Sequence, residues 1–371
     1  MNRNLNRDHI GKFACTVLKN MPIVDSANFW NLSTKKQVAP RNAFRRRHFG
    51  RHTVPASGPN IKSYWIAGSM AATLSRAELL EIASHPDVLE ISENTVVSIP
   101  TFGSNQINAA EIYQSLWNFP AIGLDQISGL GLDGEGVRIG FIDTGFDPSH
   151  PDLAGKLVGW AEFDKSGQVI DSEPHETHPR GHGTHVASVL AGNTTGIAPG
   201  ASLLAVMALP GGTGTIEQVL GGMQWIIDPD DDADTDDGAQ IVNMSWGAIG
   251  LSPVLNEAVE TMAAAGVLPV CSIGNSGPGV TMSPGNASQA IGVGAIEPYN
   301  RVAVYSGGAE VCWTEEICLT KPHIVAPGSS IPGIGVEGEY QTQSGTSFAA
   351  PMSPVPPLYF CRPILIRHCP S

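Results

Sequence analysis

The order of hydrophobic and polar positions changes near residue 131 of the chain. Beyond it, short apolar runs alternate with segments whose apolar residues recur every three to four positions, a pattern typical of strands alternating with helices. The predicted strands are 136–143, 202–207, 239–245, 267–273 and 290–296, and the predicted helices are 216–227 and 253–265. Because this alternation requires crossover connections, we expect an α/β fold with a mostly parallel central sheet and helices on both faces.

A second, shorter pattern precedes this region. Residues 63–70 predict a strand, Ser75 is a candidate N-cap for a helix that ends at His85-Pro86, and residues 88–92 and 95–99 predict two further strands. We therefore expect a small α+β unit over residues 56–100. Residues 1–55 show no sustained period and predict a basic, poorly ordered lead.

Composition and charge narrow the class of protein. With 42% hydrophobic and 15% charged residues, 42 Gly and 28 Pro in 371 residues, the chain is typical of a loop-rich globular protein and excludes a coiled coil. Residues 1–52 carry eleven basic and two acidic residues, whereas the remaining 319 carry 10 basic and 33 acidic ones. Such an acidic body excludes nucleic acid as the main partner. The basic run 45–48 could be a localisation or nucleic-acid patch, or a solvated tail.

No membrane span and no signal peptide are visible in the sequence. No segment has about 18 consecutive apolar residues, and residues 1–20 lack the apolar run of a secretory signal. Six cysteines are too few for a disulfide scaffold; Cys312 and Cys318 could form a local bridge or remain free thiols. The acidic run Asp228–Asp237 could be a solvated loop or an irregular calcium site.

Three distant segments each place a reactive side chain among small residues. They contain Asp143 at the end of a predicted strand, His182 in Gly-His-Gly-Thr-His, and Ser347 in Gly-Thr-Ser-Phe-Ala. A serine hydroxyl becomes nucleophilic when an imidazole takes its proton and a carboxylate orients that imidazole. A fourth segment places Asn275 after a buried strand, where its amide could donate to a developing oxyanion together with the backbone N–H of Ser347.

These four segments, in the order Asp, His, Asn, Ser, resemble the subtilisin-like serine proteases, or subtilases. The resemblance implies a three-layer subtilisin-like fold over residues 101–351. It also implies a serine endopeptidase that hydrolyses peptide bonds through an acyl-enzyme. Asp143 would orient the base, His182 would be the general base, Ser347 the nucleophile and Asn275 the oxyanion donor.

Two further segments resemble the family's substrate-binding edges. Ser245-Trp246-Gly247 is similar to the strand that pairs with the substrate backbone, and Gly212 and Gly214 lie in the opposing edge, so that a peptide would bind between them. His323 stands in a Lys-Pro-His segment that usually reads Lys-Pro-Asp in the family.

The resemblance also suggests partners. The unit at 56–100 is similar to an inhibitory propeptide, with an accessory domain as the alternative, and its junction with the protease would fall in 100–106. We expect a monomer that acts on polypeptides, requires no cofactor and has no metal among its site residues. An extracellular location is expected from the resemblance alone.

Several histidines allow more than one interpretation. His185, three residues after His182, could suggest a metal pair, but packing in the core is favoured. His175 and His178 lie in a polar loop and are expected to be solvated.

The end of the sequence departs from the family. After Pro351 the family continues in a long apolar helix, whereas residues 352–371 are Pro-rich and cannot continue one. We therefore expect a divergent tail and a protease domain that is truncated there. The alternative function is a catalytically inactive, truncated subtilase that acts as a peptide-binding module or is a non-functional fragment. A lipase-like hydrolase is disfavoured because the sequence has no Gly-x-Ser-x-Gly motif.

Overall fold

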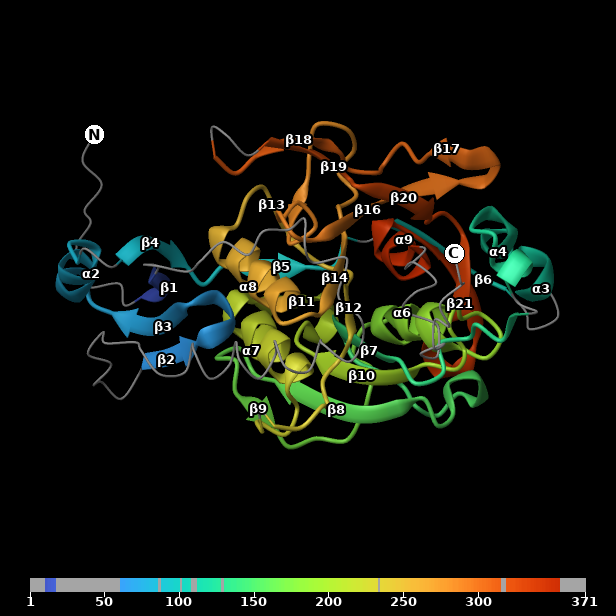
Figure 1. Ribbon diagram of the computed structural model, residues 1–371, viewed down its shortest axis with the longest axis horizontal. Coiled ribbons are helices and arrows are strands. Elements are labelled where there is room, and N and C mark those ends of the chain that lie inside the picture. The colour runs from blue at the N-terminus through green and yellow to red at the C-terminus, as the bar shows by residue number, and fades with distance from the viewer. Residues whose placement is uncertain are drawn as a thin grey trace, which may run out of the picture.

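A large α/β domain and a smaller α+β unit make up the computed structural model of the chain (Figure 1). The structure describes residues 11–17, 61–85, 88–100, 102–107, 112–127, 130–232, 234–314 and 318–353. The predicted tail therefore lies outside the described residues, apart from Met352 and Ser353.

A nine-stranded sheet forms the centre of the large domain. Its path is β17-β16-β14-β12-β7-β10-β8-β9, and β20 also pairs with β16. All of its pairs are parallel except β8–β9 and β16–β17, which confirms the mostly parallel sheet. The strands are β7 (Arg138–Asp143), β8 (Leu157–Phe163), β9 (Val169–Ile170), β10 (Ser202–Met207), β12 (Ile241–Met244), β14 (Leu268–Ser272), β16 (Ile291–Glu297), β17 (Arg301–Val302) and β20 (Ile324–Pro327).

Helices cover both faces of this sheet. Strand residues alternate between the faces, so Ile142 and Val206 pack with α7 (Ile216–Ile227) and α8 (Pro253–Ala264), whereas Phe141 and Ala205 pack with α6 (His182–Ala191) and α9 (Thr346–Met352). The two core clusters give the three layers that the sequence predicted. Helix α9 ends at Met352, close to where the prolines begin.

The small unit is an antiparallel sheet with one helix. Its strand order is β2-β3-β1-β4, and α2 (Arg76–Ala83) starts at a capping box formed by Ser75 and Glu78, as the predicted N-cap requires. The strands are β1 (Gly11–Val17), β2 (Ile61–Tyr64), β3 (Ser69–Leu74) and β4 (Val88–Glu93).

Two expectations about this part of the chain were wrong. The single strand expected at 63–70 is divided by the 3-10 turn η3 (Trp65–Ala67). The lead expected to be irregular contains β1, which pairs with β3 and β4. Its partners lie more than 50 residues away in sequence, and no local alternation of apolar and polar residues predicts such a strand. The rest of the expected lead lies outside the described residues.

The small unit binds to α7 and α8 through η3. Ile66 and Ala67 are buried there, and Glu217, in the first turn of α7, accepts hydrogen bonds from Tyr64 Oη at 3.3 Å and Asn94 Nδ2 at 2.7 Å. Burial, and next the Glu217 carboxylate, raise the pKa of Tyr64 well above its ordinary value, so its hydroxyl remains a donor. Figure 1 shows the unit beside α7 and α8.

Short elements complete the described chain. They are β5 (Val96–Ser98), β6 (Phe102–Gln106), α3 (Ile112–Ser115), α4 (Asn118–Ala121), α5 (Leu124–Ile127), η5 (Pro151–Leu153), η6 (Pro210–Gly212), β11 (Thr213–Thr215), β13 (Ala248–Ile249), β15 (Met282–Ser283), η7 (Pro298–Asn300), β18 (Ala309–Cys312), β19 (Cys318–Lys321), β21 (Ile331–Ile334), η8 (Val336–Gly338) and β22 (Tyr340–Ser344). None of the helices in these described ranges is long and apolar enough to cross a membrane.

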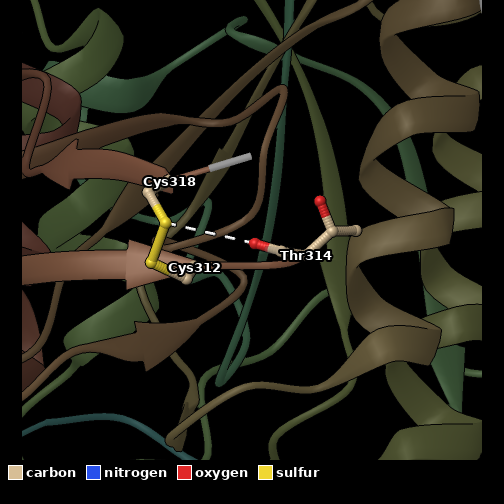
Figure 2. The surroundings of a disulfide bond; sticks show 3 residues. All are labelled: Cys312, Thr314 and Cys318. Carbon is tan, nitrogen blue, oxygen red and sulfur yellow. Dashed lines mark hydrogen bonds between the residues drawn. A yellow bond between two sulfur atoms is a disulfide. The ribbon is translucent and has the colours of Figure 1, made fainter. Parts of the chain in front are cut away.

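The bridge between Cys312 and Cys318, one of the two alternatives left open by the sequence, is present. The two residues face each other where β18 and β19 pair, with Cα atoms 4.0 Å apart. Figure 2 shows Cys318 Sγ directed toward the carbonyl oxygen of Thr314, at 4.0 Å. The disulfide closes this hairpin at its tip.

Candidate active site

The predicted acid and base are in contact. Asp143 is the last residue of β7 and His182 is the first residue of α6, so the two chain segments meet at the carboxyl end of the sheet. His182 Nδ1 lies 2.7 Å from Asp143 Oδ1, which also accepts the Thr144 N–H at 2.8 Å. Both side chains are buried. In the described chain, His182 Nε2 has no hydrogen-bond partner and is therefore able to accept a proton.

The predicted nucleophile begins α9 beside this pair. The Phe348 ring packs against the His182 ring, with centroids 5.2 Å apart, and so brings α9 next to α6. Ser347 Oγ donates to the backbone carbonyl of Ser245 at 3.0 Å rather than to His182. Rotation about the Cα–Cβ bond of Ser347 is therefore required before its proton can reach the base.

Asn275 faces the start of the same helix. Its Oδ1 accepts hydrogen bonds from Thr346 N and Thr346 Oγ1, both at 2.8 Å, which fixes the direction of the amide. Its Nδ2 then donates to the carbonyl oxygen of Pro100 at 2.7 Å. Gly345 leaves room for the Asn275 amide, because a Cβ at position 345 would lie 2.9 Å from Asn275 Nδ2.

Residues 96–100 lie as an added strand between the two predicted substrate edges. Strand β5 pairs with β11 on one side, with Val97 opposite Gly214. Ser98 exchanges two backbone hydrogen bonds with Gly247 on the other side, at 3.0 and 2.9 Å. Ile99 N donates to Gly212 O at 3.1 Å, and Pro100 follows. This strand leads the Pro100 carbonyl to Asn275.

The predicted substrate-edge residues divide into two groups. Gly212, Gly214 and Gly247 pair with residues 97–99, whereas Trp246 is fully buried in the core cluster beneath α8. Ser245 contacts the nucleophile, since its Oγ donates to the Ser347 carbonyl at 2.6 Å. A cavity of 690 Å³ lies along the added strand and is lined by Ser98, Pro100, Gly247, Asn275 and Met282, among others.

Sequence reasoning missed one carboxylate that connects the acid and base segments. Glu176 accepts hydrogen bonds from Thr144 Oγ1 at 2.7 Å and from both N–H and Oγ1 of Thr184 at 2.9 Å. It also accepts the N–H groups of Thr177 and His178. Thr144 follows Asp143 and Thr184 lies in the first turn of α6. Glu176 therefore holds the two segments at a fixed separation.

Two other histidines flank the base. His178 was expected to be solvated, but it is buried, and its ring lies edge-on to His182 with centroids 6.0 Å apart. Burial, and next the neighbouring His182, lower the pKa of His178 to about 4. His185 is buried, its Nε2 lies 3.1 Å from the Ile331 carbonyl, and burial lowers its pKa to about 3. Both rings are neutral near pH 7, and packing of His185 agrees with the favoured interpretation.

The acidic run forms a cluster away from these residues. One carboxylate oxygen from each of Asp228, Asp230 and Asp237 lies within 4.8 Å of the others. Several of these oxygens already accept hydrogen bonds within the loop, including Asp237 Oδ2 from the Asp230 N–H at 2.9 Å. Carboxylate oxygens are the ligands that a hard cation such as Ca²⁺ prefers.

Comparison with known proteins gives a consistent result. The sequence model described as "Subtilase family" matches residues 134–353. Subtilisin DY of Bacillus licheniformis is 34% identical over 246 residues, which cover 63% of this chain and 80% of that protein. Subtilisin Savinase of Lederbergia lenta is 31% identical over 242 residues, which cover 63% of this chain and 80% of that protein. The major intracellular serine protease of Bacillus subtilis (strain 168) is 33% identical over 234 residues, which cover 60% of this chain and 67% of that protein. The chain therefore belongs to the subtilase family and is a serine endopeptidase that acts on polypeptides.

Proposed function

We propose that Asp143, His182 and Ser347 form the catalytic triad of this protease. Ser347 Oγ turns from the Ser245 carbonyl and attacks the scissile carbonyl carbon, while its proton passes to His182 Nε2. Asp143 keeps the Nδ1 proton in place and stabilises the imidazolium. His182 then donates its new proton to the departing amine, leaving an acyl-enzyme that water hydrolyses by the same proton path in reverse. The 2.7 Å contact between Asp143 and His182 supports this assignment.

We propose that Asn275 stabilises the oxyanion of the tetrahedral intermediate. Its amide already donates to the carbonyl oxygen of a strand in the substrate position, and its direction is fixed by Thr346. A donor that is preorganised in this way needs no rearrangement as negative charge develops on the oxygen.

The observation that carries the proposal is the position of residues 96–100. They pair with Gly214, Gly212 and Gly247 as a substrate strand would, and the Pro100 carbonyl reaches Asn275. We therefore propose that residues 56–100 act as a propeptide and that the chain cuts its own Pro100–Thr101 bond. All proposed catalytic groups belong to one chain, which supports a monomer.

We also propose that the cluster of Asp228, Asp230 and Asp237 holds a structural cation. Subtilases often bind structural calcium, and three carboxylates within 4.8 Å fit such an ion. The cluster takes no part in the catalytic steps above.

Self-cleavage tests the proposed function. The purified full chain and its Ser347→Ala variant are incubated, and the products are identified by intact mass and amino-terminal sequencing. We expect a new amino terminus at Thr101 in the unaltered chain and none in the variant. A chain that remains whole, and that cleaves no added peptide after limited removal of residues 1–100, would contradict the proposal.

A second function is a peptide-binding module without catalysis. The hydrogen bond that Ser347 Oγ donates to the Ser245 carbonyl, instead of to His182, favours this second function. In that case a peptide corresponding to residues 95–100 would bind the chain without any hydrolysis, and Ser347→Ala would change nothing. Cleavage that disappears in Ser347→Ala excludes this function.

A further inference from the structure

The hydroxyl of Thr177 lies between one substrate edge and the segment of the proposed catalytic acid. Its Oγ1 accepts the Gly211 N–H at 3.0 Å and donates to the carbonyl oxygen of Thr144, the residue after Asp143. Met207 Sδ, 3.7 Å away, is a weaker acceptor than this carbonyl. Because a hydroxyl can accept one hydrogen bond while it donates another, this single side chain links the two segments.

On one side, the link reaches backbone that holds the strand in the substrate position. Gly211 and Gly212 lie in the turn η6, and the Gly212 carbonyl accepts the Ile99 N–H at 3.1 Å. The N–H that Thr177 accepts therefore belongs to the residue directly before the one that pairs with the substrate backbone.

Gly211 is restrained mainly by this hydroxyl. Ala208 N and Leu209 N both donate to the Asp143 carbonyl at 3.1 Å, which holds only the start of the turn. Gly211 itself is exposed, has φ +67°, and a Cβ there would meet no described atom within 4 Å. Within the described chain, its N–H has the Thr177 hydroxyl as its hydrogen-bond partner. The hydroxyl is therefore the contact that fixes this part of the turn.

On the other side, the link reaches the carboxylate that orients the base. Thr144 N donates to Asp143 Oδ1 at 2.8 Å, and the same oxygen lies 2.7 Å from His182 Nδ1. Thr144 Oγ1 also accepts the N–H of Gly183, the second residue of α6, at 2.9 Å. A shift of the Thr144 backbone would therefore turn the Asp143 carboxylate and displace the start of α6 together.

We propose that Thr177 is a positioning residue, which couples substrate pairing at Gly212 to the geometry of the acid and base. This inference rests on the proposed function. A substrate strand paired with Gly212 holds the turn, the turn orients the Thr177 hydroxyl through a backbone N–H, and the hydroxyl holds Thr144 beside Asp143. Pairing at this edge therefore raises kcat and does not only tighten binding.

Two matched peptides test the proposal on the self-processed full chain. Both are quenched fluorogenic peptides with the sequence of residues 95–104, and one carries an N-methyl group at Ile99, which removes only the donor to the Gly212 carbonyl. In the unaltered chain, we expect N-methylation to lower kcat about fivefold, in addition to any rise in KM. The ratio of the two kcat values does not depend on the active fraction of the preparation.

Three variants show whether the loss of kcat passes through the hydroxyl. Thr177→Val retains the shape of the side chain and the 3.3 Å bond from its own N–H to the Thr144 carbonyl. It should lower kcat for the unmethylated peptide about fivefold and leave little further effect of N-methylation on kcat. Thr177→Ser, which keeps the hydroxyl, should respond like the unaltered chain. Thr195→Val is the matched control, because it removes a threonine hydroxyl that donates to the Ser188 carbonyl at 3.1 Å in the loop after α6, and it should keep the full response.

Each outcome decides the question. An N-methyl group that lowers kcat equally in Thr177→Val and in the unaltered chain, or that leaves kcat of the unaltered chain unchanged, would overturn the proposal and leave the proposed function intact. Loss of the response in Thr177→Ser or in Thr195→Val would overturn it as well, and the serine variant decides even if Thr177→Val does not fold. If the unaltered chain cleaves neither peptide nor itself, the proposed function fails and the role of Thr177 fails with it.

Discussion

Replacing His323 with aspartate should stabilise the protein at neutral pH. Lys321 is 1% exposed, and its ammonium group donates to the carbonyls of Ala287 at 2.5 Å and Ala290 at 3.0 Å. Among the described residues, the side-chain contact of that group is with His323 Nδ1 at 3.4 Å, and this imidazole carries no negative charge. Subtilases usually have an aspartate at this position of the segment, so a buried cation here lacks the usual counter-charge.

The size of the expected stabilisation follows from the pKa of Lys321. Burial lowers it from 10.5 to about 8, and the nearby Cys271 thiol, whose own pKa is raised to about 12 by burial, opposes this only weakly. At Lys321 the unfolded chain therefore binds more protons than the folded one between pH 8 and 10.5. The contribution of Lys321 to stability rises with pH across that window, by about 3 kcal/mol in total, and its penalty is fully present below pH 8. Cys271 contributes in the opposite direction above pH 9, because its pKa is raised in the folded chain.

An aspartate at position 323 would favour the charged lysine and raise its pKa toward the ordinary value. We expect His323→Asp to recover about 2 kcal/mol at pH 7, which for a domain of this size raises Tm by about 4–8 °C. The gain should decline as the pH approaches 10.5. Thermal unfolding of the full chain in a Ser347→Ala background, measured from pH 7 to 10.5, avoids self-digestion.

Lys321→Met is the matched control, because it removes the titrating lysine and with it the rising contribution to stability between pH 8 and 10.5. The reasoning would be refuted if His323→Asp left Tm at pH 7 unchanged and retained the rise toward alkaline pH. Identical pH profiles of Tm for the unaltered protein and Lys321→Met would refute it as well.

Three further predictions concern the active site and the acidic cluster. Asn275→Ala should lower kcat for peptide hydrolysis about 10²–10³-fold with little change in KM, because the oxyanion loses a fixed donor; steady-state kinetics measure both, and an unchanged kcat would contradict the assignment. Gly345→Ala should also impair catalysis, since the new Cβ would approach Asn275 Nδ2 to 2.9 Å and φ is +154° there; a self-cleavage time course equal to that of the unaltered chain would argue against it. Millimolar Ca²⁺ should raise Tm and a chelator should lower it, whereas Asp237→Asn should remove most of this difference; a Ca²⁺ response that survives in Asp237→Asn would place the ion elsewhere.

The sequence predicted those parts of the fold that depend on local periodicity. The segment expected to be a helix at 216–227 has those bounds as α7, and the strand expected at 202–207 is β10. Asp143 and His182 could be expected to meet because strand ends and helix starts gather at one edge of a parallel sheet. The catalytic roles of Asp143, His182, Asn275 and Ser347 were predicted from the resemblance of their motifs to the subtilase family.

Other features depend on contacts between distant and locally unremarkable residues. Glu176 is one acidic residue in a polar loop, and only the fold brings Thr144 and Thr184 to its carboxylate. The buried position of His178 likewise includes a ring contact with His182, which lies at the start of α6. Strands β6 and β22 are short and largely polar, so neither alternation nor hydrophobicity distinguishes them from loops.

Labelling with a fluorophosphonate tests the central claim most directly, because this reagent reacts with a serine that a neighbouring base activates. The self-processed full chain is treated with the reagent, digested with a second protease, and the modified residue is identified by mass spectrometry. We predict modification of Ser347 in the unaltered chain and its loss in His182→Ala. A folded, processed chain that takes up no label at Ser347, or that labels equally well without His182, would contradict the proposed triad.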